Sequence, residues 1–329
     1  MNQRITWSQL PQTVRDGVEN ILGEAVTEAE SQPGGFSPGS ADRVQLASGR
    51  RAFVKAASAL HNATTPGLHR REAAVTAALP PGVLVPDFLG MYDDGTWVAL
   101  VLADVAGRHP QEPWAAHEVV QVLDALVSVG QLDLPAELEL PRYQESLQGA
   151  FLGWERLRSR PLETMGSWAA SHLDQLVEVA QRGTLELAGD TLVHGDLRAD
   201  NILLTGQDPG AGSWHSRGQD AGRFGNGTGR GVVFLDWPWA ARGAAWVDGL
   251  SVLINVKTLN PSAQVDQFFE THPVFAGTNA HAITAVMAGW AGYFLDMSRR
   301  PAPAGIPTLR PFQRQQADAL IDWIQSRGL

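Results

Sequence analysis

The sequence of 329 residues predicts an α+β fold with two lobes, a small β-rich lobe followed by a larger, mostly helical one. In the first 107 residues, short apolar runs alternate with turn residues, a pattern typical of strands. In most of residues 108–329, apolar residues recur three and four positions apart, a pattern typical of helices. We therefore expect the chain to pass from one lobe to the other near Gly107.

The composition excludes several classes of protein. The sequence contains 35 acidic and 25 basic residues, a formal net charge of −10, and no cysteine. This charge disfavours a general nucleic-acid-binding protein, which needs a basic surface to neutralise phosphates. The lack of cysteine excludes disulfides and thiolate nucleophiles. Because the sequence has no long apolar stretch and no signal-peptide core, we expect a cytoplasmic protein with neither a membrane nor a nucleic acid as partner.

The first lobe is expected to hold two helices and two pairs of strands. Apolar residues at helical spacing predict a helix over 12–23, and QPGGFSPGS at 32–40 predicts a loop. A strand hairpin is predicted around the turn at 48–49, and an alanine-rich helix follows over 68–79. A further pair of strands is expected on either side of the Asp-Asp-Gly turn at 93–95.

The second lobe shows helical periodicity in five segments. These are residues 114–129, 143–158, 168–182, 280–299 and 310–325. Between the third and fourth segments we expect a β-like island of three short strands, Thr191–Val193, Ile202–Thr205 and Val232–Leu235. The residues between its last two strands, 206–231, are rich in glycine, and we expect a flexible insertion there.

The same lobe is rich in aromatic residues, most of which we expect to pack in the core. They are Trp237, Trp239, Trp246, Trp290, Tyr293 and Phe294.

The most informative strings are LVHGDLRADNILL at 192–204 and VVFLDW at 232–237. An apolar strand is followed by Asp196, Asn201 comes five residues later, and a second apolar strand ends on Asp236. Phosphoryl transfer from a nucleotide needs such a set: one carboxylate to orient the attacking hydroxyl, and an amide oxygen and a second carboxylate to hold Mg²⁺. The tripeptide HGD alone could be a polar turn, but the combination favours a phosphotransferase.

The pattern H-G-D-x-x-x-x-N followed by an apolar residue, Asp and Trp resembles the aminoglycoside phosphotransferase and choline kinase superfamily, whose members are small-molecule kinases with a protein-kinase-like fold. The resemblance implies that Asp196 is the catalytic carboxylate, that Asn201 and Asp236 bind magnesium, and that His194 supports the loop.

Further along the chain, GAAWVDGLSVL is similar to the start of a helix in this family. The similarity implies that Asp248 is a structural acid and helix cap. Ala244 departs from the pattern, because the family usually has an aspartate there. The departure weakens the local match but leaves the implied metal site unchanged.

The chain has only two lysines, Lys55 and Lys257, against 23 arginines. Lys55 ends the predicted strand RRAFVK, where the family places the lysine that contacts the α- and β-phosphates of the nucleotide. An edge-strand surface lysine is the alternative. Glu72, on the next predicted helix, matches the acid that pairs with this lysine, although Arg70 and Arg71 offer it other partners.

The resemblance also implies the rest of a nucleotide site. Gly35 and Ser37, in the loop GGFSPGS, would approach the phosphates through their backbone amides. The segment VALVLADVAG resembles the hinge between the lobes, at about residues 102–107, where the carbonyl of Ala103 and the amide of Val105 would meet adenine. The chain is then divided into a nucleotide-binding lobe, 1–107, and a catalytic and substrate lobe, 108–329.

Together these features imply transfer of the γ-phosphate of ATP or GTP to a hydroxyl of a small molecule, such as an aminoglycoside or another antibiotic, with Mg²⁺ as cofactor. Two alternatives stay open, a kinase of another hydroxylated metabolite such as choline or a sugar, and a nucleotide-binding pseudokinase. The joint presence of Lys55, Asp196, Asn201 and Asp236 disfavours the pseudokinase. Arg198, within the catalytic loop, does not favour a polycationic acceptor.

Overall fold

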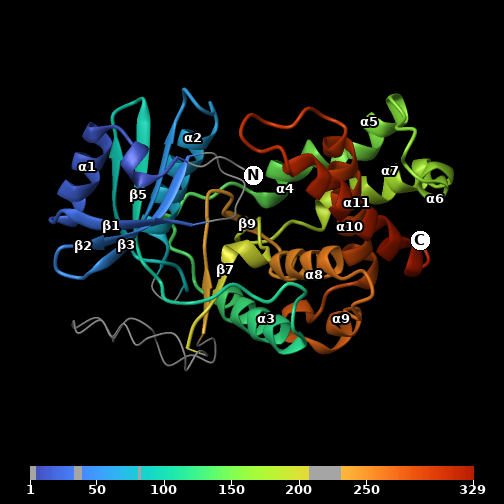
Figure 1. Ribbon diagram of the computed structural model, residues 1–329. Coiled ribbons are helices and arrows are strands. Elements are labelled where there is room, and N and C mark those ends of the chain that lie inside the picture. Colours follow the sequence, from blue (N-terminus) through green and yellow to red (C-terminus); the bar gives the residue numbers. More distant parts are fainter. Residues whose placement is uncertain (1–4, 33–38, 81–82, 207–230) are drawn as a thin grey trace.

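The expected α+β architecture is confirmed, with an antiparallel sheet at one end of the molecule and a helical part at the other (Figure 1). The computed structural model describes residues 5–32, 39–80, 83–206 and 231–329. The predicted glycine-rich loop with Gly35 and Ser37, and all of the expected insertion except its two end residues, lie outside the described residues.

The sheet has five strands in the order β1-β2-β3-β5-β4, and every neighbouring pair is antiparallel. The strands are β1 (Val26–Ser31), β2 (Ser40–Leu46), β3 (Arg51–Ser58), β4 (Phe88–Asp93) and β5 (Trp97–Ala103). Both expected strand pairs are present. Strand β1 was not predicted from the sequence VTEAES, because it lies at the edge, exposes most of its side chains and therefore lacks apolar alternation.

One helix covers each face of this sheet. Helix α1 (Gln12–Leu22) buries Val14 and Val18 in the same apolar cluster as Val54 of β3. Helix α2 (Thr65–Ala78) packs on the other face, where its Ala73 joins Leu100 of β5. Because side chains alternate along a strand and Lys55 pairs in register with Leu100, Lys55 faces α2 rather than α1. The register therefore directs Lys55 toward the helix that carries Glu72.

The C-terminal part is built around helix α10 (Ala280–Ser298), which packs against several other helices. Its main partners are α5 (Gly153–Ser159), α7 (Leu173–Leu185) and α11 (Leu309–Ser326). The remaining helices of this part are α3 (Ala116–Gly130), α4 (Tyr143–Gln148), α6 (Ser167–Ser171), α8 (Val247–Leu259) and α9 (Gln267–Thr271).

Two of the helices expected from periodicity are each divided in two. The segment 143–158 forms α4 and α5 with a short 3-10 turn at Ala150–Leu152 between them, and 168–182 forms α6 and α7. Glycines flank that 3-10 turn, since Gly149 precedes it and Gly153 follows it. Periodicity cannot detect such a break, because the apolar spacing continues across it.

The expected island of three strands is instead two separate two-stranded ribbons. Strand β6 (Thr191–Val193) pairs with β9 (Ala241–Gly243), whereas β7 (Ile202–Leu204) pairs with β8 (Val232–Phe234). Strand β9 was missed because its sequence, ARG, carries no strand pattern. The two ribbons hold the ends of the segments 194–201 and 235–240, which contain the sequence motifs.

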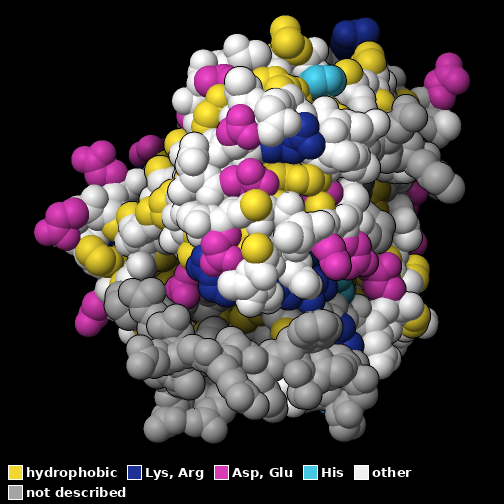
Figure 2. Space-filling model, turned by 60° about the vertical axis from the view of Figure 1, so that its left-hand side comes forward, with side chains coloured by type: hydrophobic (Ala, Val, Ile, Leu, Met, Phe, Trp, Pro, Cys, Tyr) yellow, Lys and Arg dark blue, Asp and Glu magenta, His cyan; other side chains and the backbone are white. Residues whose placement is uncertain are grey.

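Among the described helices, none combines the length and apolar character that crossing a bilayer requires. On the face that Figure 2 brings forward, acidic side chains are more prominent than basic ones and are interspersed with uncharged surface.

The close approach of α5 to α10 gives a first prediction. A Cβ atom on Gly153 would lie 2.2 Å from the backbone of Gly292, whereas a Cβ on Gly149 would meet nothing within 4 Å. Gly153→Ala is therefore expected to destabilise the protein by about 1–3 kcal/mol through overpacking. Gly149→Ala should be neutral or stabilise it by up to about 1 kcal/mol. Urea unfolding measures both, and equal midpoints for the two variants would contradict the packing described.

Candidate active site

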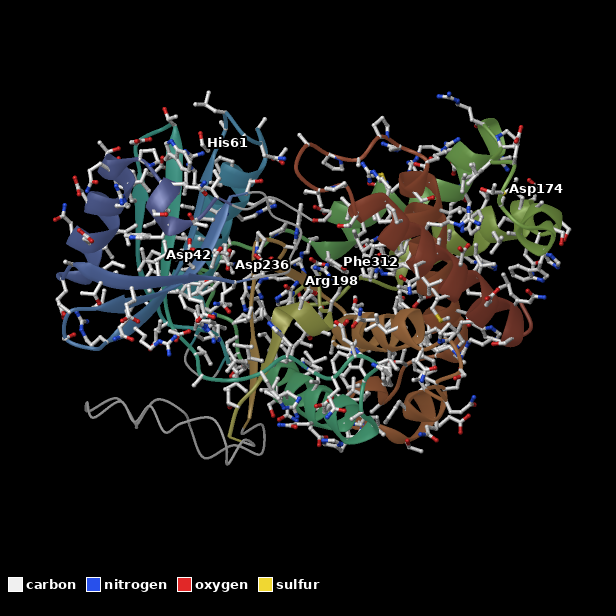
Figure 3. The ribbon with its side chains drawn as sticks, in the orientation of Figure 1. Asp42, His61, Asp174, Arg198, Asp236 and Phe312 are labelled. Carbon is white, nitrogen blue, oxygen red and sulfur yellow. The ribbon has the colours of Figure 1, made fainter. Side chains whose placement is uncertain are left out.

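A cavity of about 1240 Å³ lies between the sheet and the helical part, and the predicted site residues that the structure describes line it. Its walls come from β3, α2 and the end of β5 on one side and from the motif segments, α10 and α11 on the other. In Figure 3, Asp236, Arg198 and Phe312 follow one another from the sheet side toward the C-terminal helices.

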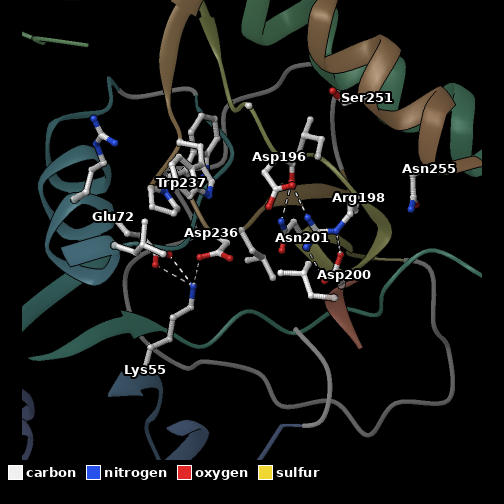
Figure 4. Close-up of a pocket in the computed structure, with 18 of the residues that line it drawn as sticks. Lys55, Glu72, Asp196, Arg198, Asp200, Asn201, Asp236, Trp237, Ser251 and Asn255 are labelled. Carbon is white, nitrogen blue, oxygen red and sulfur yellow. Dashed lines mark hydrogen bonds and ion pairs between the residues drawn. The ribbon is translucent and has the colours of Figure 1, made fainter. Parts of the chain in front are cut away.

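Lys55 makes two ion pairs that connect the two parts of the molecule. Its Nζ atom donates to both carboxylate oxygens of Glu72 on α2, at 2.9 and 3.0 Å. It also donates to Oδ1 of Asp236, 2.9 Å away, which follows β8 in the C-terminal part (Figure 4). The expected pair with Glu72 is thus present, and Lys55 is not an edge-strand surface lysine, since its side chain is 16% exposed.

The three charges perturb one another strongly. Burial opposes the charge of Lys55, but Asp236 and Glu72 outweigh it and raise the pKa of Lys55 above its ordinary value. Burial acts against Asp236 as well, yet Lys55 holds the pKa of this carboxyl down at about 2. Burial raises the pKa of Glu72, which is the most enclosed of the three, against the opposing effect of Lys55. Lys55 and Asp236 are therefore both charged at neutral pH.

Asp236 has an unusual backbone. Its φ is 68°, and it is the only non-glycine residue in the described part of the chain with a positive φ. Residues other than glycine adopt a positive φ only rarely, so the contacts around Asp236 must hold its backbone in this conformation. The neighbours on both sides are anchored: Leu235 donates its amide to the carbonyl of Asn201 at 2.8 Å, and Trp237 donates its indole N–H to Phe234 at 3.0 Å.

A buried carboxylate holds the start of the motif loop. Asp248 accepts the backbone N–H groups of His194, at 2.6 Å, and of Gly195, at 3.0 Å. Asp248 is the structural acid that the resemblance implied, but it is not a helix cap: it lies in the first turn of α8, whose N-cap is Trp246, and it binds the loop instead. These two hydrogen bonds attach the start of the motif loop to helix α8.

His194 is a buried hydrogen-bonding residue, 1% exposed. Its Nε2 donates to the carbonyl of Leu235 at 2.7 Å, and its Nδ1 accepts the amide of Asp196 at 3.3 Å. These partners require the neutral tautomer with the proton on Nε2, and burial lowers the pKa of His194 accordingly. The ring thus ties the segment before Asp236 to the loop that carries Asp196.

Asp196 and Asp200 hold Arg198 between them. One guanidinium nitrogen of Arg198 contacts Asp196, and two others donate to both oxygens of Asp200 at 3.0 Å (Figure 4). Burial raises the pKa of Asp196 to about 6, against the opposing effect of Arg198. Asn201 donates its Nδ2 to the carbonyl of Asp196 at 2.8 Å, so its Oδ1 is the end that can face a cation.

Ala103 and Val105 line the same cavity, at the end of β5. The amide of Ala103 donates to the carbonyl of Asp87 at 2.8 Å, which fixes the position of this segment. Asp104 between them is bound by Arg43 at 3.0 Å and Arg51 at 3.2 Å. The stretch after β5 is therefore held in place by contacts from β2 and β3.

The donor set suits a magnesium ion that is shared with a ligand. Asn201 and Asp236 offer one amide oxygen and one carboxylate, the hard oxygen donors that Mg²⁺ prefers. Among the described residues, no group of three or more His, Asp and Glu side chains could hold a metal by itself. The cation would therefore need further oxygens from a bound phosphate or from water.

Several residues of the site carry no signal in the sequence. Asn255 of α8 is buried, and its side-chain oxygen accepts the indole N–H of Trp114 at 2.9 Å and the backbone amide of Ala199 at 3.1 Å. It therefore helps to hold the motif loop in place. His69 lines the cavity and is buried, and burial, followed by the charge of Lys55, lowers its pKa to about 4. Asn255 acts through contacts between segments that are distant in the chain, which no local sequence pattern reveals.

Most of the aromatic residues expected in the core pack in or against it, and several of them also line the cavity. Trp237 and Trp246 are buried in the core, as expected. Trp290 and Phe294 are partly buried and pack against that core. The cavity is lined by Trp237, Trp239, Trp290, Tyr293 and Phe294, and Trp239 is 48% exposed.

Known structures share this fold at low sequence identity. Aminoglycoside phosphotransferase APH(4)-Ia is 14% identical, with a TM-score of 0.57 over 95% of this chain and 99% of that one. An aminoglycoside phosphotransferase from Alicyclobacillus acidocaldarius is 14% identical, with a TM-score of 0.56 over 96% and 95%. Plasmodium vivax ethanolamine kinase is 11% identical, with a TM-score of 0.54 over 92% and 82%.

These likenesses confirm the resemblance at the level of the fold. By sequence, no protein-family model matches the chain, and no curated protein matches it significantly. Since one fold can carry different functions, the activity has to be argued from the site itself.

The buried ion pairs generate the next prediction. Lys55→Met leaves Glu72 without its cation in an enclosed site, so we expect it to destabilise the protein by roughly 3 kcal/mol. Adding Glu72→Gln to Lys55→Met should restore part of this loss, because the more enclosed of the two carboxylates that lose their cation is then neutral, and only the more exposed Asp236 stays charged. Thermal and urea unfolding measure both variants.

The matched control is Lys257→Met, which removes the chain's other lysine. The Nζ atom of Lys257 donates only to backbone carbonyls, those of Pro261 at 2.7 Å and Ala263 at 3.2 Å. Its loss leaves no buried carboxylate, so the effect should be smaller. A destabilisation as large as that of Lys55→Met would contradict the interpretation.

Proposed function

We propose that this chain is a kinase that transfers the γ-phosphate of ATP or GTP to a hydroxyl group of a small molecule. The observation that carries the proposal is the convergence, in one cavity, of Lys55 with its two carboxylate partners and of Asp196 with Asn201. A structural neighbour supports it: a thermostable mutant of APH(4)-Ia, 12% identical, is known in a ternary complex with ADP and hygromycin B.

On the nucleotide side, Lys55 is proposed to bind the α- and β-phosphates. Glu72 orients its ammonium, and a compact ammonium fits between phosphate oxygens better than a planar guanidinium would. The segment 102–107 is proposed as the hinge between a nucleotide lobe, 1–107, and a catalytic lobe, 108–329, with adenine meeting the Ala103 carbonyl and the Val105 amide. Gly35 and Ser37 are proposed to approach the phosphates.

On the acceptor side, Asp196 is proposed to accept a hydrogen bond from the attacking hydroxyl and then its proton. Burial raises the pKa of Asp196 to about 6, so this carboxylate is mostly ionised at neutral pH yet basic enough to take the proton. Asn201 and Asp236 are the proposed ligands of Mg²⁺. When bound, this cation neutralises charge on the β- and γ-phosphate oxygens.

The alternatives are a kinase of choline, a sugar or another metabolite, and a pseudokinase. The position of Asp196 beside Asn201, across the cavity from Lys55, supports an active kinase over a pseudokinase. The direct test is ADP release with aminoglycosides, macrolides, choline-like amines and sugars as acceptors, compared with ADP release without any acceptor. If no compound stimulates ADP release although the nucleotide binds, the pseudokinase is favoured.

For the base, we expect Asp196→Asn to lower turnover of an identified acceptor at least about 100-fold, because loss of a general base removes transition-state stabilisation. Nucleotide affinity should change little. Asp174→Asn is the control, since Asp174 is a surface acid on α7 whose side chain is 87% exposed, far from the cavity (Figure 3). Near-normal turnover by the Asp196 variant would exclude this residue as the base.

For the metal, binding of AMP-PNP should weaken strongly when Mg²⁺ is removed, because Asn201 and Asp236 supply only part of an octahedral shell. Asp236→Asn should weaken nucleotide binding in the presence of Mg²⁺ more than in its absence. Calorimetry with and without chelator measures both effects. Equal affinity under the two conditions would contradict the assignment of the metal ligands.

A further inference from the structure

The part of the cavity beyond Asp196, here called the acceptor half, is lined by Trp239 and by residues from 143–156 and 290–316. It adjoins the proposed base. The hydroxyl of Tyr143 donates to the carbonyl of Gly195 at 3.4 Å, and the charge of Asp196 acts on Tyr293. A molecule whose hydroxyl reaches Asp196 must therefore place its body against these residues.

The charged residues of this half are basic. Of the described residues that line it from 143–156 and 290–316, two are charged, Arg156 and Arg300, and none is acidic. Both bind Asp296, which has no exposed side-chain surface, at 2.7 Å each, and Arg299 binds the same carboxylate at 2.6 Å. One buried negative charge thus faces three positive ones, which leaves an excess of positive charge at this end of the cavity.

One further arginine, Arg310, extends the positive field. Arg310 donates to the carbonyl of Pro301 at 3.1 Å and to the amide of Gln313 at 2.7 Å, both of them neutral partners. Burial raises the pKa of Tyr293, while the charges of Arg310, Arg300 and Arg156 all act in the opposite direction. The charges of these three arginines therefore all act on Tyr293.

The rest of the acceptor half is mostly aromatic and apolar, with Ser146, Gln313 and Gln316 as its polar residues. Trp290 stacks on Phe294 with ring centres 5.4 Å apart, and Tyr293 packs against both. Trp239 lies beside the catalytic loop, because a Cβ on Gly195 would be 3.3 Å from the Trp239 side chain, and it exposes 48% of its surface. An exposed tryptophan next to Asp196 offers a flat surface for a ring.

The acids elsewhere in the cavity are engaged. Lys55 binds Glu72 and Asp236, Arg198 binds Asp196 and Asp200, and Arg43 and Arg51 bind Asp104. Glu112, on the segment between β5 and α3, is the remaining acid of the described lining. In the acceptor half itself, a polycation would meet no acid among the described lining residues from 143–156 and 290–316 and would face two arginines at the far end.

From this distribution, and resting on the proposed kinase function, we propose that the acceptor is a hydroxylated molecule with a flat apolar body and an anionic group. The body packs on Trp239 and the aromatic cluster of α10, and the anionic group, a carboxylate or a phosphate, faces Arg156 and Arg300. Guanidinium groups bind both anions through paired hydrogen bonds. Polycationic aminoglycosides are poor ligands of this pocket.

Probes that differ only in charge test the proposal. Hydroxymethyl-naphthoate, the corresponding amide, the aminomethyl compound and the phosphonate share one body and one hydroxyl. Calorimetry on the full chain should show the carboxylate or the phosphonate binding about tenfold more tightly than the amide, equivalent to about 1.4 kcal/mol, with the amine weakest. The order of the two anions identifies the group that the arginines prefer. Kanamycin is the polycationic comparison.

Arg300→Gln should reduce the preference for the anion over the amide several-fold, while the affinity for the amide changes little. Arg299→Gln is the matched control, because Arg299 binds the same Asp296 but does not line this cavity. It should leave the preference unchanged.

Tighter binding of the amine or of kanamycin, no binding of any naphthalene probe, or an equal loss of preference in both variants would overturn the proposal. These measurements need no turnover. If the anions bind as expected but never stimulate ADP release, the charge preference stands and the kinase function fails.

Discussion

The arrangement of the site depends on a single buried ammonium. Lys55 stands on β3, Glu72 on α2 and Asp236 after β8, so one side chain connects the sheet, the helix that covers it and the motif segment of the other part. Burying three charges is costly, and the cost is offset only if each charge keeps its partner. The same requirement fixes the relative position of the sheet and the motif segment. The interaction is therefore a constraint on how the two parts meet.

The motif segments are held by buried polar groups rather than by long regular elements. The ribbons that flank them are only three residues long per strand, too short to fix side chains alone. Asp248 instead accepts two loop amides, and His194 connects that loop to the carbonyl before Asp236. Because these groups lie in a low-dielectric interior, each lost partner would leave an unsatisfied atom. This explains how Asp236 can keep a backbone conformation that its own side chain disfavours.

The sequence predicts the parts of the structure that local physics decides. The hairpin that ends near Lys55, the helix with Glu72 and the spacing from Asp196 to Asn201 follow from alternation, periodicity and motif, and the structure brings these side chains into one cavity. Strand β1 could not be predicted, because an exposed edge strand lacks an apolar pattern. Asn255 could not be assigned a role either, since its contacts to Trp114 and Ala199 join residues more than 50 positions away in the chain.

The acceptor half is the part where the fold and the motifs give the least guidance. Its residues come from helices whose periodicity only requires apolar side chains toward the core, so Trp290 and Phe294 satisfy the helix pattern whether they face the core or a ligand. The structure separates these cases, because Trp246 is buried in the core and does not line the cavity, whereas Trp290 and Phe294 are partly buried and line it. In the sequence, Arg156 and Arg300 look like ordinary surface arginines. Only the structure shows that both bind Asp296 and together give this side of the acceptor half its positive charge. At 11–14% identity, the neighbours show a shared fold, and the fold alone does not determine what the cavity binds.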